Sequence, residues 1–129
     1  MKLNLASGKI RMEGFTNVDY APAVNPDVVY DLDVTPWPWE DDSVDEVHCS
    51  HYIEHTKDLM KFMNELYRIM KPGASAKLVA PYYTSIRAWQ DPTHTRVISE
   101  NTFLYYNKEW RIANQLDHYP IKTDFDFGY

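Results

Sequence analysis

The sequence has little of several features that would assign it to a class at once. Its single cysteine, Cys49, excludes an internal disulfide. The first five residues have neither the apolar length nor the cleavage site of a signal peptide. No apolar run approaches the roughly 20 residues that a membrane helix needs. We therefore expect a cytoplasmic protein whose partners do not include a membrane.

Runs of basic residues are absent too. The 13 Lys and Arg residues are scattered, and the 19 Asp and Glu residues give the chain a formal net charge of −6. A negative chain opposes non-specific attraction to phosphate backbones, so bulk nucleic-acid binding is not expected. Internal repeats are also missing. The 44% hydrophobic and 15% aromatic residues suit one globular domain over residues 1–129.

Short apolar runs, separated by polar, proline or glycine residues, predict five strands. They cover residues 3–5, 15–18, 28–32, 44–49 and 76–80. Apolar residues at three- and four-residue spacing predict a helix over residues 58–70, which Thr56 or Asp58 caps. A second, shorter helix is expected over residues 99–106. This order predicts a mostly parallel α/β sheet with reduced helices, because the early connections are too short for full crossovers.

Polar and small residues follow the first two predicted strands, where ligands of such sheets bind. Residues 6–8 (ASG) form a turn that lets backbone N–H groups approach an anion, and Asp19 is placed to accept hydrogen bonds from ribose hydroxyls. Only eleven positions separate Gly8 from Asp19, against about twenty in the dinucleotide fingerprint, which disfavours an NAD enzyme. The alternative is a turn glycine followed by a solvated loop carboxylate.

Five motifs in order resemble the class I S-adenosylmethionine-dependent methyltransferases, in particular their type 11-like group. The matching segments are residues 3–8 (LNLASG), 14–19 (GFTNVD), 31–45 with WPWEDDSVD at 37–45, 50–55 (SHYIEH) and 65–73 (ELYRIMKPG). The resemblance covers the chain to about Tyr82. It implies a Rossmann-like fold that binds S-adenosylmethionine and transfers its methyl group to an acceptor.

The resemblance also assigns cofactor contacts to individual residues. Leu5, Ala6, Ser7 and Gly8 would contact the methionine part, and Asp19 the ribose. Asp31 and Leu32 would contact the adenine, and Ser50 and His51 the sulfonium. Asp33 competes with Asp31 for the adenine. A carboxylate can accept bonds from both ribose hydroxyls, and an apolar side chain can cover a purine face.

The chain departs from the family in three ways. Ala6 stands where the family usually has glycine, which adds a methyl group where the backbone approaches the ligand. The helices after the first two strands are missing, which leaves one sheet face for a partner to cover, for instance in a homodimer. The family's C-terminal hairpin is absent, as in a minimal or C-terminally truncated member.

The segment 81–96 lies where such enzymes build their acceptor pocket, and we expect the acceptor to be a small molecule. His94 is the candidate base, and Arg96 could hold an anionic acceptor. The aromatic residues Tyr82, Tyr83 and Trp89 could stack on a planar acceptor. Packing and loop-stabilising hydrogen bonds are the alternative for all of them.

One rival pattern is the His-x-x-Glu-His of residues 51–55, which fits a group of zinc peptidases. Zinc peptidases need both histidines on one helical face, whereas here the first histidine follows a strand and a helix begins only later. No metal site is therefore predicted. A stronger rival is a chain that binds S-adenosylmethionine without transferring methyl, as a regulator or partner subunit.

Overall fold

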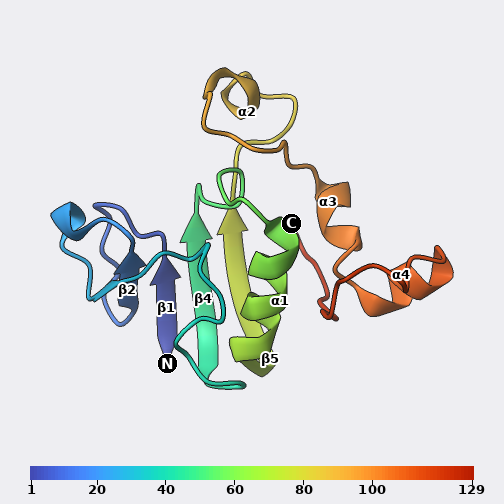
Figure 1. Cartoon of the computed structure of the whole chain (residues 1–129), viewed down its shortest axis with the longest axis horizontal. Coiled ribbons are helices and arrows are strands. Elements are labelled where there is room, and N and C mark those ends of the chain that lie inside the picture. The colour runs from blue at the N-terminus through green and yellow to red at the C-terminus, as the bar shows by residue number, and fades with distance from the viewer.

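The sheet of the computed structural model, which describes all 129 residues, has five parallel strands in the order β3-β2-β1-β4-β5. All the strands point the same way, so their carboxyl ends share one edge (Figure 1). Their bounds are Lys2–Leu5 for β1, Thr16–Asp19 for β2, Val28–Val29 for β3, Val44–Ser50 for β4 and Met70–Val79 for β5. The predicted parallel α/β sheet is confirmed.

Two strands differ in length from their predictions by more than one residue. β3 has two residues where five were expected, because the chain turns inward after Tyr30 and buries Leu32 in the core, where Trp37 Nε1 donates to its carbonyl oxygen (3.0 Å). β5 begins six residues early, directly after the helix, with a register shift against β4. The apolar content of the sequence does not reveal where β3 ends or where β5 begins, because tertiary packing sets both positions.

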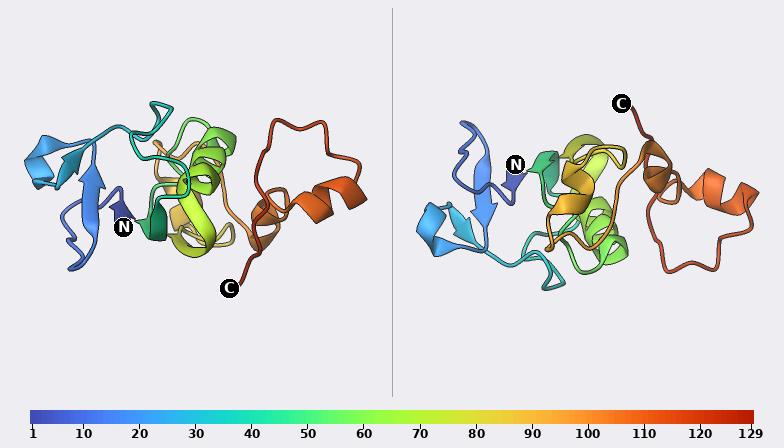
Figure 2. Two further views of the ribbon diagram at one scale, coloured as in Figure 1. Left: turned by 90° about the horizontal axis from the view of Figure 1, so that it is seen from below. Right: turned by 90° about the horizontal axis from the view of Figure 1, so that it is seen from above.

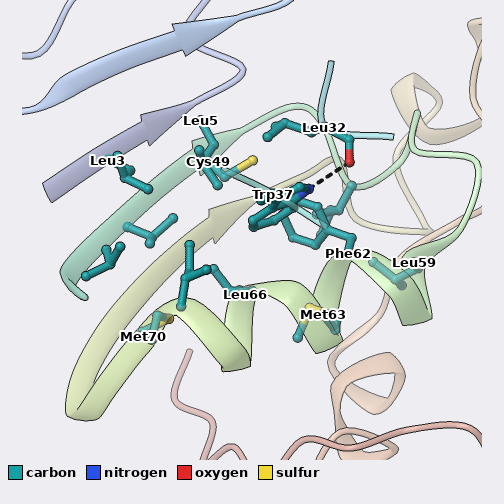
Figure 3. Packing of buried hydrophobic residues seen from close by; sticks show 14 of the residues in the cluster. Leu3, Leu5, Leu32, Trp37, Cys49, Leu59, Phe62, Met63, Leu66 and Met70 are labelled. Carbon is teal, nitrogen blue, oxygen red and sulfur yellow. Dashed lines mark hydrogen bonds between the residues drawn. The ribbon is translucent and has the colours of Figure 1, made fainter. Parts of the chain in front are cut away.

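The helix α1, Leu59–Ile69, covers one face of the sheet. Asp58 caps it by accepting from the Lys61 N–H (3.0 Å), as predicted. Its inward side chains pack on β1 and β4 (Figure 3). The core residues on the helix are Leu59, Phe62, Met63, Leu66 and Ile69, and those on the sheet include Leu3, Leu5, Val47 and Cys49. This apolar layer is the core that fixes the strand ends in place.

The opposite face of the sheet has no covering helix, and it is polar. Only the short 3-10 turn Pro22–Val24 (η1) lies between β2 and β3, and no helix lies between β1 and β2. Because neighbouring residues in a strand face opposite sides, Asn4, Asn17 and His48 lie on this face, where Asn4 bonds both of the others (2.9 and 3.3 Å). Asn4 and Asn17 are only 3% and 2% exposed and bond the Ile10 carbonyl oxygen and the Met12 N–H. The loop after β1 therefore covers this part of the face, and a partner on the rest of it stays a prediction.

Three short helices follow the sheet. α2, Arg87–Gln90, lies beyond the carboxyl ends of β4 and β5 rather than those of β1 and β2 (Figure 2). α3, Glu100–Leu104, falls within the predicted second helix, and α4, Lys108–Ala113, was not predicted. No helix has both the length and the apolar content to cross a membrane.

Candidate functional site

A cavity of about 440 Å³ lies at the carboxyl ends of β1, β2 and β3, where the sequence places its polar turn residues. A volume of this order suits a small ligand or a large part of a nucleoside cofactor. Its lining residues are Ala6, Asp19, Tyr20, Tyr30, Asp31, Leu32, His51, Tyr52, His55 and Thr93. Five of the predicted cofactor residues therefore meet at one cavity: Ala6, Asp19, Asp31, Leu32 and His51.

The turn after β1 is unusually tight. Ala6 and Gly8 both have positive φ angles, 52° and 54°. The Ser7 N–H donates to the Val18 carbonyl oxygen (3.0 Å), which ties the turn to β2. A left-handed φ costs an L-residue such as alanine about 1 kcal/mol or more, whereas glycine adopts it freely. The backbone geometry thus calls for glycine at residue 6, where the chain has alanine.

Asp19 connects the turn after β1 to the loop after β2. Its Oδ2 accepts from the Gly8 N–H and its Oδ1 from the Ala21 N–H, both at 2.9 Å. The side chain is almost buried, yet it lines the cavity. Each carboxylate oxygen has a second lone pair, so Asp19 can also accept from a bound hydroxyl group. The Gly8 N–H is already occupied and is not free for a ligand.

The segment after β3 brings a charge and an apolar side chain to the opposite wall. Asp31 is exposed at the cavity, while Leu32 is 5% exposed and lines it from the core side. Asp33, the competing adenine contact, has another role: its Oδ1 accepts from Thr56 Oγ1, Tyr52 Oη and the Lys57 N–H. Burial raises the pKa of Asp33, but these bonds outweigh it and hold that pKa below its usual value. Asp33 fixes the loop after β4 and does not line the cavity.

Other predicted cofactor residues contribute differently. The Leu5 side chain is fully buried in the core, and Ser7 and Ser50 do not line the cavity. His51 does line it, from a left-handed residue (φ 57°) whose N–H donates to the Val79 carbonyl oxygen. The sharp turn at His51 aims the chain after β4 back over the strand ends.

Comparison with known proteins decides the family. Residues 11–77, about half of the chain, match the model of the methyltransferase domain. The chain belongs to this methyltransferase family. This is the family that the sequence motifs resembled, and S-adenosylmethionine is the cofactor that the family implies.

A curated relative is the 2-phytyl-1,4-naphtoquinone methyltransferase of Nostoc punctiforme, which is 28% identical over 96 residues. The match covers 70% of this chain but only 42% of that relative. The solved structures agree on the fold. A SAM-dependent methyltransferase from Archaeoglobus fulgidus matches with a TM-score of 0.64 at 23% identity, over 89% of this chain and 59% of that one. A chain from the complex of the Haloferax volcanii Trm112 methyltransferase activator and the putative methyltransferase matches with a TM-score of 0.60 at 23% identity, over 88% and 58% of the two chains.

The residues at the cavity fit the family's cofactor. Asp19 retains lone pairs for the ribose hydroxyls, and Leu32 offers an apolar surface to a purine. The backbone at residue 6, where the family usually has glycine, adopts a left-handed conformation that glycine takes without strain. The alternative reading of Gly8 and Asp19 as an ordinary turn and a solvated carboxylate is wrong for Asp19, because that side chain is only 8% exposed.

Of the predicted acceptor segment 81–96, Thr93 lines the cavity, but none of the residues named as acceptor contacts does. Tyr82, Tyr83 and Trp89 are 43%, 44% and 66% exposed and do not line it. Arg96, expected to hold an anion, donates to the Ile53 carbonyl oxygen (2.7 Å). His94 does not line the cavity either: its side chain is 9% exposed, with Nδ1 3.0 Å from the Ala88 carbonyl oxygen.

Sequence reasoning missed five residues of the cavity wall: Tyr20, Tyr30, Tyr52, His55 and Thr93. Tyr20 directly follows Asp19, and Tyr30 follows β3, so the rule that ligands bind beyond strand ends could have found both. Burial raises the pKa of Tyr52, whose hydroxyl donates to Asp33, so Tyr52 remains neutral and acts as part of the wall. Thr93 comes from a distant loop and has no signal of its own in the sequence.

Proposed function

We propose that the chain binds S-adenosylmethionine in this cavity and transfers its methyl group to a small-molecule acceptor. The observation that carries the proposal is the meeting of Ala6, Asp19, Asp31 and Leu32 at one cavity. These residues come from three separate strand ends, and each is the kind of group that one part of the cofactor requires. A cytoplasmic location is part of the proposal, since the one thiol has no disulfide partner.

Each wall of the cavity has a distinct task in this proposal. Asp19 holds the ribose through the lone pairs that its two backbone bonds leave free. Asp31 and Leu32 bind the adenine edge and face. His51, at the end of β4 and 62% exposed, lies beside the sulfonium. Transfer is then an in-line displacement: the acceptor atom bonds to the methyl carbon as the sulfur–carbon bond breaks. The electron pair of the broken bond stays on sulfur.

The next question is which residue removes a proton from the acceptor. The prediction that His94 acts as a base requires His94 to reach the cavity, but His55, whose ring packs edge-on against it at 4.6 Å between centroids, lines the cavity in its place. A small-molecule acceptor is consistent with the printed activity of the Nostoc punctiforme relative. That relative is more than twice as long as the matched segment, so its own substrate is not assigned to this chain.

The test is calorimetric titration of S-adenosylmethionine and its demethylated product into the wild-type chain and two variants. Asp19→Ala removes the ribose acceptor, and Asp117→Ala removes an exposed carboxylate outside the cavity wall as a matched control. We expect the wild type and Asp117→Ala to bind the compounds at one saturable site. Asp19→Ala should bind them about 100-fold more weakly, because it loses two charge-assisted hydrogen bonds to the ribose. A folded wild-type chain that binds neither compound would refute the proposal.

The second candidate function is a non-catalytic cofactor-binding regulator or partner subunit. The observation in its favour is that the aromatic residues Tyr82, Tyr83 and Trp89 stay exposed and leave the acceptor side open. One structural neighbour, of 23% identity, comes from a complex with the activator Trm112. Release of the demethylated product in the presence of a panel of small phenols, thiols and quinols would favour the enzyme. Tight cofactor binding with no turnover on any of them would favour the regulator.

A further inference from the structure

A second group of chemically active side chains lies beside the cavity, where the sequence pattern predicted no metal site. Glu54, His55 and His94 offer ligand atoms that all lie within 4.8 Å of one another. We propose that these three residues form a binding site for a divalent transition-metal ion of the zinc type. None of the three ligands is among the residues assigned to the cofactor, but the site adjoins them, because His51 lies 3.5 Å from Glu54 Oε1. The proposal stands independently of methyl transfer.

Two segments forty residues apart are locked together to form this group. The Thr95 N–H donates to the Glu54 carbonyl oxygen at 2.7 Å, and Thr95 Oγ1 donates to the Thr56 carbonyl oxygen at 2.9 Å. Arg96 donates to the Ile53 carbonyl oxygen at 2.7 Å. Backbone and side-chain bonds therefore fix the loop after β4 against the loop after α2. The pattern of residues 51–55 is thus not a helical zinc motif, but two of its members meet a third ligand from elsewhere.

Hydrogen bonds orient both histidine rings toward the group. His94 Nδ1 lies 3.0 Å from the Ala88 carbonyl oxygen, which can only accept, so this nitrogen carries the proton. His55 Nδ1 lies 3.0 Å from Thr93 Oγ1, whose own hydrogen is donated to Asp91 Oδ1 (2.7 Å), so Thr93 accepts from His55. In both rings Nε2 is left with the lone pair. Such a second partner on Nδ1 is the usual support of a metal-binding histidine.

Glu54 provides the observation that requires a cation. Its side chain is 3% exposed, and its Oε2 has no hydrogen-bond partner at all. Its Oε1 faces His51 Nδ1 at 3.5 Å and His55 Nε2 at 3.8 Å, both too long for a good hydrogen bond. A buried carboxylate without partners is costly, and a carboxylate facing an imidazole lone pair is repelled. A metal ion between these atoms removes both costs, because it binds the carboxylate and both imidazole nitrogens. A single proton can join the carboxylate to only one of the two nitrogens.

The donor set and its surroundings select the kind of ion. Two imidazole nitrogens and one carboxylate oxygen are ligands that suit Zn²⁺ and its neighbours better than Mg²⁺ or Ca²⁺. Tetrahedral ligands at about 2.1 Å from zinc are about 3.4 Å apart, so the group would close by roughly 1 Å on binding. Asp91 Oδ2, 3.6 Å from His94 Nε2, adds negative charge at the rim. His55 and Thr93 also line the cofactor cavity, so the fourth position opens toward it.

The test is titration of Zn²⁺ into chelator-treated full-length chain against a competing metal-binding dye, with Co²⁺ as an optical probe. We expect one equivalent to bind the wild type, Mg²⁺ not to compete, and Co²⁺ to give the visible bands of a tetrahedral site. Glu54→Gln and His94→Ala should weaken Zn²⁺ binding by more than about 100-fold, beyond the loss of an outer partner. His118→Ala, which removes an exposed surface histidine, is the matched control and should bind as the wild type does.

No binding by the wild-type chain, or equal binding by Glu54→Gln, His94→Ala and His118→Ala, would overturn the proposal and leave a proton as the cation between these groups. The Co²⁺ spectrum of the wild type does not depend on any variant being folded. S-adenosylmethionine is titrated into the same metal-free and zinc-loaded samples. Zinc binding without cofactor binding contradicts only the proposed function, and the reverse result contradicts only the metal site.

Discussion

Two nearly buried carboxylates, Asp19 at the end of β2 and Glu54 in the loop after β4, differ in how their oxygens are satisfied. Asp19 accepts two backbone N–H bonds at 2.9 Å, one on each oxygen. Glu54 has one oxygen with no partner and another that faces only imidazole nitrogens at 3.5 and 3.8 Å. Both oxygens of Asp19 have hydrogen-bond donors without a ligand, and their remaining lone pairs can accept from one. The Glu54 carboxylate lacks such donors, so its environment indicates a bound cation that the protein atoms do not supply.

The difference shows that burial alone does not identify the task of a carboxylate. Asp19 holds two turns together, so its loss should damage the fold as well as the cofactor site. Glu54 contributes little that its neutral amide could not, so its loss should damage only metal binding. The following changes test this contrast, from the largest expected effect to the smallest.

Asp19→Ala should lower the free energy of unfolding by about 2 to 4 kcal/mol, because it leaves the Gly8 and Ala21 N–H groups without their acceptor. Urea denaturation followed by circular dichroism measures the change. Asp31→Ala, which removes an exposed carboxylate from the same cavity, is the control and should stay within about 1 kcal/mol of the wild type. Equal stability of Asp19→Ala and the wild type would mean that these two bonds do not support the turn.

Glu54→Gln should raise the unfolding free energy of metal-free protein by about 1 kcal/mol at pH 8, because an amide replaces a buried charge without partners. The matched control is Glu65→Gln. The Glu65 carboxylate accepts from Arg68 and from the Trp37 N–H (2.6 Å), so its replacement should destabilise the protein. If both variants lose stability alike, Glu54 is satisfied in solution and the contrast with Asp19 fails.

Ala6→Gly should stabilise the protein by about 0.5 kcal/mol, since relief of the left-handed φ of 52° exceeds the added entropy of the unfolded chain. It should also tighten cofactor binding, because the methyl group beside the cavity is removed. Ala21→Gly, at an ordinary φ of −94°, is the control and should lose stability. Thermal unfolding of the two variants in parallel separates these signs.

Asp27, an exposed carboxylate, gives the smallest effect and a pH signature. The Asn17 N–H, Arg11 and the Asn17 side chain lower the pKa of Asp27 to about 2 from an ordinary value of 3.8. A lowered folded-state pKa means that the stabilisation is complete above pH 3.8 and is lost as the pH falls toward 2. The stability difference between wild type and Asp27→Asn should therefore shrink across this window, and a difference independent of pH would contradict the assignment.

Much of the sheet could be predicted because its signals are local. The apolar runs of β1, β2 and β4 are flanked by polar residues, and the spacing of apolar residues in α1 reports its buried face. The short helix α4 was missed because its six residues show no full apolar period and a single charged residue, Arg111, is buried by bonds to the Tyr105 and Thr123 carbonyl oxygens. Tertiary contacts of this kind leave no pattern in the local sequence.

The candidate site divides in the same way. Asp19 ends β2, and Asp31 and Leu32 come two and three residues after β3, so their meeting at one edge could be predicted from the parallel sheet. His55 and Thr93 could not, because their contact depends on the loop bonds of Thr95 and Arg96 to the segment after β4. The direction of His94 was likewise inaccessible, since the Ala88 carbonyl oxygen that orients its ring belongs to a helix of four residues.

The central claim is that the cofactor binds at the ends of β1, β2 and β3, and the most direct measurement is a two-dimensional NMR titration of the 15.2 kDa chain with the demethylated cofactor. We expect the largest saturable amide shifts at residues 6–8, at Asp19 and at residues 31–32. The residues around Phe125, which line a separate apolar cavity of about 340 Å³ between α1, β5 and the C-terminal segment, should not shift. Shifts confined to that second cavity, or no shifts at all in a folded sample, would contradict the account.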